Sequence, residues 1–322
     1  MRTLRLPKKS RAGGTNRFLE RPSGSGGIPD ACEVKTYIEQ EKVYAEHMIE
    51  FAKFRSVHLN QTLKLTAQVG WSHRRNDLSM LLGLGCGYVA IMNNHVVGTM
   101  CMTYFGEVAT IGLLIVDEKM RGQGLGSHLM KLALEKAGRC ECRLIASSDG
   151  EILYSKLGFE QSEGIPTHQG IVVGEQVPGE AEWAAEHDFD QIAQIDRSAT
   201  GIDRRTLLSA LWNRGVFAVI RHAGKVAGYA AMVRYGRDEV AGPVVGSSTE
   251  EARRLLSFLL SHRIGAFVRI DLRQQSGLAD WLNSIGITEV ETSMAMRRGK
   301  KHAGMGSPFR TYVLATMQFG FP

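Results

Sequence analysis

The segment from Thr110 to Gly138, TIGLLIVDEKMRGQGLGSHLMKLALEKAG, limits the possible folds more than any other. It opens with a short apolar run, Ile111–Val116, whose length and branched side chains predict a buried strand. After a polar break, apolar residues recur from Leu125 at the spacing of an amphipathic helix, and the final glycine ends that pattern. Three further glycines therefore lie where a strand passes into a helix.

A glycine-rich turn at this place favours binding of an anion. The first turn of a helix carries N–H groups without partners and the positive end of the helix dipole, and glycines let a phosphate approach the backbone. The spacing is neither the dinucleotide motif G-x-G-x-x-G nor a nucleotide-triphosphate loop, because no Gly-Lys-Ser/Thr follows. A diphosphate is the expected ligand, although such a turn can also be structural alone.

Two motifs in order give this segment a family resemblance. The turn Arg121-x-x-Gly124-x-Gly126, between strand and helix, resembles the acetyl-coenzyme A loop of the GNAT acetyltransferases. Downstream, the segment SDGEILYSKLGF (148–159) is similar to the helix with a tyrosine and a terminal Leu-Gly-Phe that GNAT chains place after their fifth strand. The resemblance implies acetyl-coenzyme A as co-substrate and no metal ion. The implied coenzyme contacts are Leu114, Ile115 and Val116 on the strand and Arg121, Gly122, Gln123, Gly124, Leu125, Gly126 and Ser127 in the loop and first helical turn.

The resemblance also assigns catalytic and acceptor-binding residues. Tyr154 is expected to protonate the leaving thiolate, because a phenol held against the sulfur can donate a proton. Glu107 is the first choice for the group that takes the proton of the attacking amine, with Asp77 and His73 as alternatives. The region that closes over the acceptor in GNAT folds contributes Trp71, His73 and Asp77 as expected substrate contacts.

The second half of the chain repeats the pattern of the first. Gly98, Gly106 and Gly112 recur as glycines displaced by 130 positions, and the first two lie in the similar strand segments VVGTMCMTYFG and VAGYAAMVRYG. This predicts a second GNAT-like unit. At 130 positions after Arg121, Gly124 and Gly126 the chain has Glu251, Arg254 and Leu256. The glycines of the loop are therefore absent from the second unit, and this repeat looks degenerate.

The start of the second unit carries a further motif. Asp196-Arg-Ser-Ala-Thr-Gly201-Ile-Asp203-Arg204 resembles the D-x-x-x-x-G-x-D-R signature of tandem GNAT proteins with a degenerate C-terminal repeat. Asp203 is also a good helix N-cap. Arg204 is expected to bind a carboxylate of the acceptor with its two-pronged guanidinium group.

At 322 residues the chain has the length of two domains. The expected fold is α/β (α+β), with two GNAT-like mixed, mostly antiparallel sheets flanked by helices. Residues 1–45 form a basic leader without regular structure, 46–174 a catalytic domain, and 181–322 a degenerate domain that shapes the acceptor site or supports the fold. A linker is predicted at 174–180.

Charge and composition narrow the classes of partner. Of the net charge of +6, the first 30 residues supply +5, so the remainder is nearly neutral and argues against nucleic acid as a partner. No apolar run reaches the roughly 18 residues of a membrane span. The five cysteines are scattered, which favours the cytoplasm over a disulfide framework. We expect a monomer that acts as a pseudo-dimer, or a homodimer.

The sequence thus predicts an acetyl-CoA-dependent N-acetyltransferase acting on a primary amine of a small molecule. One alternative is an enzyme that acetylates lysines or N-termini of proteins. The other is a non-catalytic regulator that binds acetyl-CoA. The intact loop and Tyr154 argue against the regulator, and the extra folded half favours a small acceptor.

Overall fold

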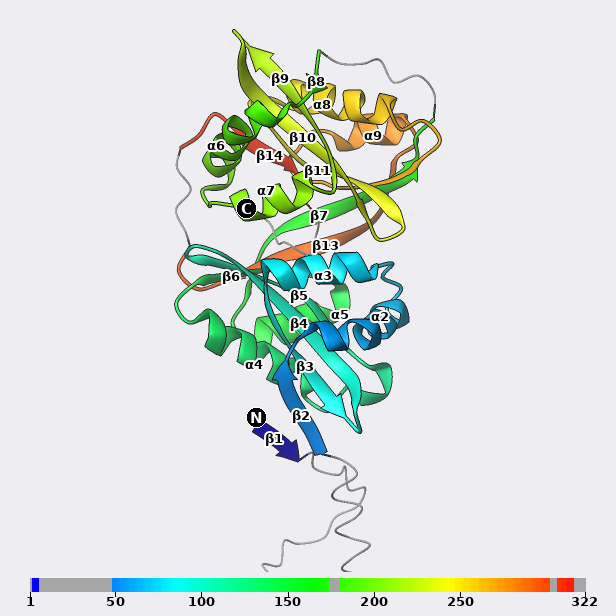
Figure 1. The fold of residues 1–322 in the computed structure, drawn as a ribbon, viewed down its shortest axis with the longest axis vertical. Helices are drawn as coiled ribbons and strands as arrows, with labels where there is room; N and C mark the ends of the chain where they lie inside the picture. Colours follow the sequence, from blue (N-terminus) through cyan, green and yellow to red (C-terminus); the bar gives the residue numbers. More distant parts are fainter. Residues whose placement is uncertain (1, 6–47, 174–179, 302–305, 316–322) are drawn as a thin grey trace, which may run out of the picture.

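The computed structural model describes residues 2–5, 48–173, 180–301 and 306–315 (Figure 1). The first half contains β1 (Arg2–Arg5), β2 (Met48–Lys53), α2 (Leu59–Gln68), α3 (Arg75–Leu84), β3 (Gly85–Met92), β4 (His95–Phe105), β5 (Val108–Val116), α4 (Leu125–Ala137), β6 (Glu141–Ala146), α5 (Ser148–Lys156) and β7 (Glu160–Ile171). The second half contains β8 (Glu182–Trp183), α6 (Phe189–Thr200), α7 (Arg205–Trp212), β9 (Gly215–His222), β10 (Lys225–Tyr235), β11 (Asp238–Gly246), α8 (Thr249–Ser261), β12 (Phe267–Asp271), α9 (Ala279–Ser284), β13 (Thr288–Arg298) and β14 (Arg310–Val313).

All described strands belong to one 14-stranded sheet. Its order is β1-β2-β3-β4-β5-β6-β13-β7-β12-β11-β10-β9-β8, and β14 pairs with β11 off this path. Among the described strands only β5 with β6 and β11 with β12 run parallel. The mixed, mostly antiparallel fold with flanking helices is therefore confirmed, but the two expected sheets are continuous.

The two halves exchange strands at the centre of this sheet. Strand β13, from the second half, lies between β6 and β7 of the first half. Strand β7, from the first half, lies between β13 and β12. Neither half thus completes its sheet without a strand of the other. Alternating side chains determine which face of a strand is buried, but they do not identify its neighbours, so the sequence does not reveal the exchange.

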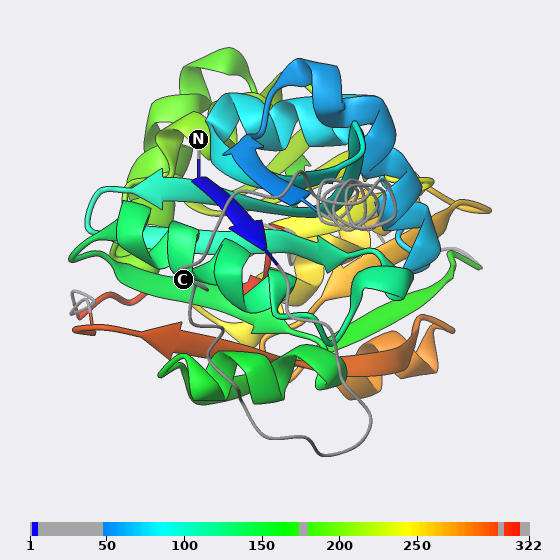
Figure 2. The ribbon, with the colours of Figure 1, turned by 90° about the horizontal axis from the view of Figure 1, so that it is seen from below.

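Helices cover both faces of the sheet (Figure 2). On one face α2 and α3 of the first half and α6 and α7 of the second share a single apolar core. On the other face α4 and α8 pack over separate cores, one in each half. The shared core and the exchanged strands make the halves one structural unit.

Several local predictions can be compared with the structure. The β3–β4 hairpin turns at Asn93 and Asn94 with φ of 49° and 61°, as the asparagine pair predicts. Residues 2–5 form β1 and pair with β2, although no regular structure is expected there. The rest of the leader, 6–47, and the predicted linker at 174–179 lie outside the described residues. None of the helices in the described part of the chain is long and apolar enough to cross a membrane.

Candidate active site

Strand β5 separates from β6 where the sequence predicts the coenzyme. Its parallel pairing with β6 covers Val108–Thr110, and beyond it no described strand pairs with that edge of Leu114–Val116. Just before this opening Leu113 adopts a φ of 54°, and the register of β5 against β4 shifts. A branched, buried residue in the left-handed region is costly and typical of functional sites. The opening leaves backbone groups available to a ligand that lies along the strand.

The glycine loop at the start of α4 is open to an anion. Gly122 and Gly124 have φ of 75° and 82°, and a Cβ atom added to either would meet no atom within 4 Å. Gly124 is the N-cap residue of α4 and offers no capping side chain, and the first turn has no acidic residue. The N–H groups of that turn therefore lack an internal acceptor. Strand end, loop and first turn bring together all ten residues predicted to contact the coenzyme.

Helix α5, which carries Tyr154, packs against this loop. Leu153, its neighbour, lies 3.4 Å from the Cβ position of Gly126, so α5 packs against the third glycine of the loop. The Tyr154 ring covers Gly150, where an added Cβ would lie 2.8 Å from the ring, and it contacts Phe159 edge to face. Burial raises the pKa of Tyr154 to about 12. The phenol therefore keeps its proton at neutral pH, as a proton donor requires.

Trp71 and His73 meet a tyrosine of the second half on the opposite face of the sheet. The ring centroids of Trp71 and His73 are 5.8 Å apart, and those of His73 and Tyr235 are 5.5 Å apart. Within the described part of the chain, both ring nitrogens of His73 and the hydroxyl of Tyr235 are buried without a hydrogen-bond partner. These three polar atoms therefore have unused hydrogen-bonding capacity.

The sequence analysis missed Tyr235. Its only signal is its place as the aromatic residue before Gly236 in the repeated strand segment. Burial and the nearby Asp77 raise the pKa of Tyr235 well above its ordinary value, and the Cys101 thiol adds to this. Cys101 pairs with Gly112, next to the left-handed Leu113. Tyr235 and Cys101 of β4, the strand next to β5, therefore belong to the same apolar core.

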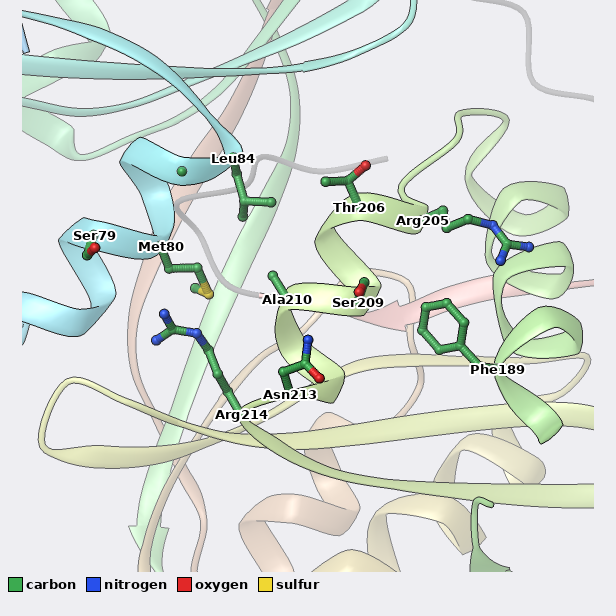
Figure 3. Close-up of a pocket in the computed structure, with 11 residues that line it drawn as sticks. Ser79, Met80, Leu84, Phe189, Arg205, Thr206, Ser209, Ala210, Asn213 and Arg214 are labelled. Atoms are coloured by element: carbon green, nitrogen blue, oxygen red, sulfur yellow. The ribbon is translucent and has the colours of Figure 1, made fainter. Parts of the chain in front are cut away.

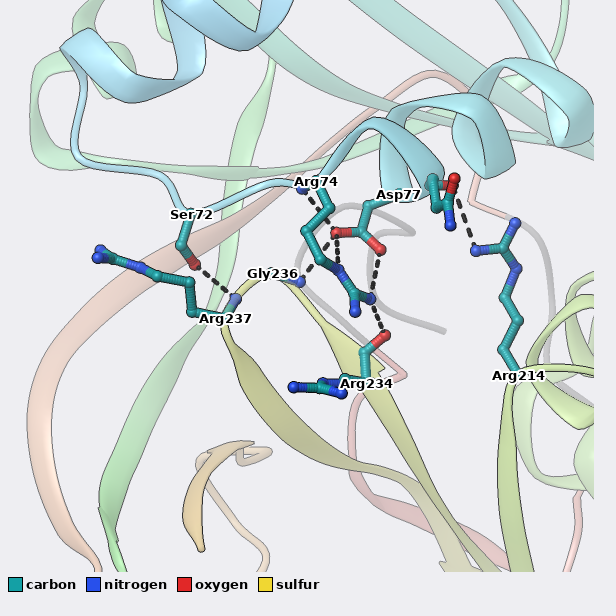
Figure 4. Close-up of polar contacts among 8 residues, drawn as sticks. Ser72, Arg74, Asp77, Arg214, Arg234, Gly236 and Arg237 are labelled. Atoms are coloured by element: carbon teal, nitrogen blue, oxygen red, sulfur yellow. Dashed lines mark hydrogen bonds and ion pairs between the residues drawn. The ribbon is translucent and has the colours of Figure 1, made fainter.

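Asp77 joins the two halves and is not a free base (Figure 4). Its carboxylate forms an ion pair with Arg74 at 2.9 Å and accepts hydrogen bonds from the backbone N–H groups of Arg74 (2.8 Å) and Gly236 (2.9 Å). Arg74 in turn donates to the carbonyl oxygen of Arg234. Because its oxygens already accept these bonds and its side chain is 1% exposed, Asp77 cannot take part in substrate binding or proton transfer as predicted.

Two further predicted residues lie away from the site. Glu107 is exposed in the turn between β4 and β5, seven positions before Leu114, which is about 23 Å along a strand. Arg204 is 2% exposed and donates to both carboxylate oxygens of Asp196, at 3.0 and 2.6 Å. Burial alone would lower the pKa of Arg204, but Asp196 raises it above its ordinary value. The structure therefore favours neither prediction: Glu107 lies far along the strand from Leu114, and Arg204 already pairs with Asp196.

The signature around Arg204 is structural in this chain. Gly201 ends α6 with a φ of 75°, and the carboxylate of Asp203 accepts a hydrogen bond from the N–H of Arg205 at the start of α7. The hydroxyl of Tyr229 donates to Asp196. The motif thus closes one helix, starts the next and anchors both to β10.

A cavity of about 700 Å³ opens between α3 and α7, on the same face of the sheet as His73 (Figure 3). Arg214 lies at its wall and donates to the carbonyl oxygen of Asn76 in α3. Arg205 on another side is paired with Asp190 at 2.6 Å. The remaining lining residues are Ser79, Met80, Gly83, Leu84, Phe189, Thr206, Ser209, Ala210 and Asn213. The two halves therefore line an open hollow on the surface of the molecule.

The burial of His73 predicts a pH-dependent stability. Burial lowers the pKa of His73 from 6.5 to about 4, so the unfolded chain binds a proton between these values that the folded chain does not. Stability that depends on neutral His73 is therefore complete above pH 6.5 and decreases as the pH falls towards 4, by up to about 3 kcal/mol. Denaturant unfolding of the parent and His73→Gln proteins from pH 7.5 to 4.5 measures this. If the free energy of unfolding changed equally with pH in the two proteins, the prediction would be wrong.

Comparison with known proteins identifies both halves. Residues 84–161 and residues 192–305 each match an acetyltransferase (GNAT) domain family. The uncharacterised N-acetyltransferase YitH of Bacillus subtilis (strain 168) is 26% identical over 247 residues, which cover 74% of this chain and 87% of that protein.

Solved structures have the same fold. A candidate acetyltransferase from Pyrococcus horikoshii superposes with a TM-score of 0.72 at 20% identity, covering 84% of this chain and 96% of its own. A tandem GNAT protein from the clavulanic acid biosynthesis pathway superposes with a TM-score of 0.56 at 14% identity. The match covers 79% of this chain and 99% of that protein. At these identities the two structures establish the fold alone.

The fold and the matched families define a protein with two GNAT acetyltransferase domains in tandem. We place the chain among the GNAT N-acetyltransferases, a class whose members generally use acetyl-CoA.

Proposed function

We propose that the protein transfers the acetyl group of acetyl-CoA to a primary amine of a small molecule, at a single site in the first half. The observation that carries this proposal is the opening of β5 beside an uncapped glycine loop. The opening offers a strand edge at Leu114–Val116 that pairs with no described strand, and the loop offers the N–H groups at the start of α4. Pantetheine and diphosphate would lie along these two features in turn.

The candidate residues on the two faces of the sheet would have complementary roles in the transfer. A backbone N–H near Leu114 would stabilise the negative charge that develops on the thioester oxygen. His73 would accept, directly or through water, the proton that the amine loses as the C–N bond forms. Tyr154 would donate its proton to the sulfur as the C–S bond breaks. His73 is uncharged and Tyr154 is protonated at neutral pH, as these roles require.

The position of the second half favours a small acceptor. The β10–β11 turn covers the loop between α2 and α3, where Gly236 bonds to Asp77 and the N–H of Arg237 lies 3.4 Å from the hydroxyl of Ser72. An alanine Cβ at Gly236 would lie 2.5 Å from that hydroxyl, so the contact is close. An extended peptide has little room beside His73 if this turn stays in place.

A coenzyme-release assay tests the proposal. Purified protein with acetyl-CoA is offered amines, amino acids and aminosugars, and in parallel lysine peptides and peptides with free N-termini. We expect release of CoA with members of the first group, together with a product heavier by one acetyl group. Turnover of peptides alone would favour a protein acetyltransferase. Coenzyme binding without turnover of any amine would favour a regulator.

His73→Gln should lower kcat by about 100-fold, the usual contribution of a general base, with little change in the affinity for acetyl-CoA. Glutamine keeps much of the shape of the ring but cannot take up the proton. His95→Gln is the matched control, because His95 is exposed at the start of β4 and bonds only to its own turn. Equal losses of kcat in the two variants would exclude a catalytic role for His73.

A further inference from the structure

We propose that the chain fills the coenzyme cleft of its own second half. Strand β14 lies where pantetheine would lie, and the carboxylate of Glu251 lies where the diphosphate would lie. The comparison rests on the coenzyme site proposed for the first half.

The second half has the same opening as the first. The parallel pairing of β11 with β12 covers Glu239–Val240, and β11 then leaves β12. The register of β11 against β10 also shifts, as that of β5 against β4 does. A displacement of 130 positions relates Val244–Gly246 to Leu114–Val116. The end of β11 in the second half is therefore the counterpart of the end of β5 in the first half.

Strand β14 occupies this opening and bonds to both of its sides. It pairs with β11 in the register Val244 with Val313 and Gly246 with Arg310. On the other side the N–H of Leu314 donates to the carbonyl oxygen of Asp271, and the N–H of Arg273 donates to that of Tyr312, both at 2.9 Å. Val313 and Leu314 are fully buried. Figure 1 shows β14 beside β11.

Glu251 occupies the anion position at the start of α8. Its carboxylate accepts hydrogen bonds from the N–H of Ser247 at 2.7 Å and from the hydroxyl of the same serine at 2.8 Å. The hydroxyl of Ser248 accepts the N–H of Glu251 and caps the helix. Glu251 is 8% exposed and aligns with Arg121 of the first half. The first turn of α4 has no acidic residue and no capping side chain. The start of α8 has both: the Glu251 carboxylate is the anion, and the Ser248 hydroxyl is the cap.

Backbone energetics explain why the cleft is filled. The separated edges of β11 and β12 would otherwise carry buried N–H and C=O groups without partners, which is costly. In the first half the coenzyme can provide those partners, and in the second half the chain provides them. The second half therefore binds no coenzyme and contributes β13 and Tyr235 to the first.

Glu251→Ala tests the anion position, with Glu250→Ala as the matched control. Glu250 lies in the same first turn, carries the same charge and pairs with Arg254 on the surface. Glu251→Ala should lower the Tm by several degrees and Glu250→Ala by much less. Inorganic pyrophosphate should then raise the Tm of Glu251→Ala more than that of the parent protein or of Glu250→Ala, because it replaces the lost carboxylate. Glu251→Gln keeps one acceptor oxygen and serves if the alanine variant does not fold.

Equal pyrophosphate shifts in all three proteins would overturn the assignment of Glu251. This result does not depend on acetyl transfer, so it can be separated from failure of the proposed function.

Hydrogen exchange of the full chain tests the role of β14. Without coenzyme, the amides of residues 311–314 should be protected as strongly as those of β10. Saturating CoA should protect the α4 loop and leave 311–314 unchanged, and calorimetry should give one CoA per chain. Loss of protection in 311–314 on addition of CoA, or two sites per chain, would overturn the proposal.

Discussion

Replacement of Gly124 by leucine is expected to abolish measurable binding of acetyl-CoA and, with it, release of CoA. Gly124 has a φ of 82°, a conformation that costs other residues about 1–2 kcal/mol. A side chain there would also project into the open space in front of the α4 amides, where the diphosphate is expected. Isothermal titration calorimetry should show at least a hundredfold weaker binding, equivalent to about 2.7 kcal/mol.

Gly138→Leu is the control for backbone strain. Gly138 ends the same helix with a φ of 62° and also has no atom within 4 Å of its Cβ position, but it lies at the opposite end of α4. The Gly138→Leu protein should lose about as much stability as the Gly124→Leu protein, but it should still bind the coenzyme. Unchanged affinity in Gly124→Leu would show that the coenzyme binds elsewhere.

Tyr154→Phe is expected to lower kcat by about 10- to 1000-fold, within the range for loss of a general acid, while the Kd for CoA changes little. The variant keeps the ring that packs on Gly150 and Phe159 and removes only the hydroxyl. That hydroxyl acts on the departing sulfur and contributes little to ground-state binding. Single-turnover measurements with saturating acetyl-CoA give the rate of the transfer step directly.

Tyr104→Phe controls for the loss of any tyrosine hydroxyl in this half. The Tyr104 hydroxyl donates to the carbonyl oxygen of Lys136 at the end of α4, so its removal should change the Tm and leave kcat within about twofold. If Tyr154→Phe turns over as fast as the parent protein, Tyr154 has a packing role alone.

Local signals in the sequence predict the coenzyme side of the site. The apolar run of β5, the glycines before α4 and the tyrosine of α5 are contiguous in the chain, and their geometry depends on a few neighbouring residues. Gly124 adopts a positive φ because glycine does so at little cost, and the apolar pattern of α4 determines where the helix begins.

The acceptor side depends on contacts between distant residues. Trp71 and His73 lie side by side between α2 and α3, and Tyr235 reaches them from 162 positions further along the chain than His73. Asp77 and Arg204 carry the expected chemical groups, yet each is occupied by a partner, Arg74 and Asp196 respectively. Whether a charged side chain is free or paired depends on tertiary neighbours that no local pattern encodes.

The sequence alone therefore determined the fold class, the repeat, and the glycine-rich turn between β5 and α4, since all of these follow from spacing within short segments. Only the tertiary structure decided that β7 and β13 each lie between strands of the other half, that β14 closes the second cleft, and that His73 faces Tyr235. The physical reason is that backbone N–H and C=O groups are the same in every residue. A strand edge accepts any segment that the rest of the fold brings to it, and that choice is made by the packing of the whole chain.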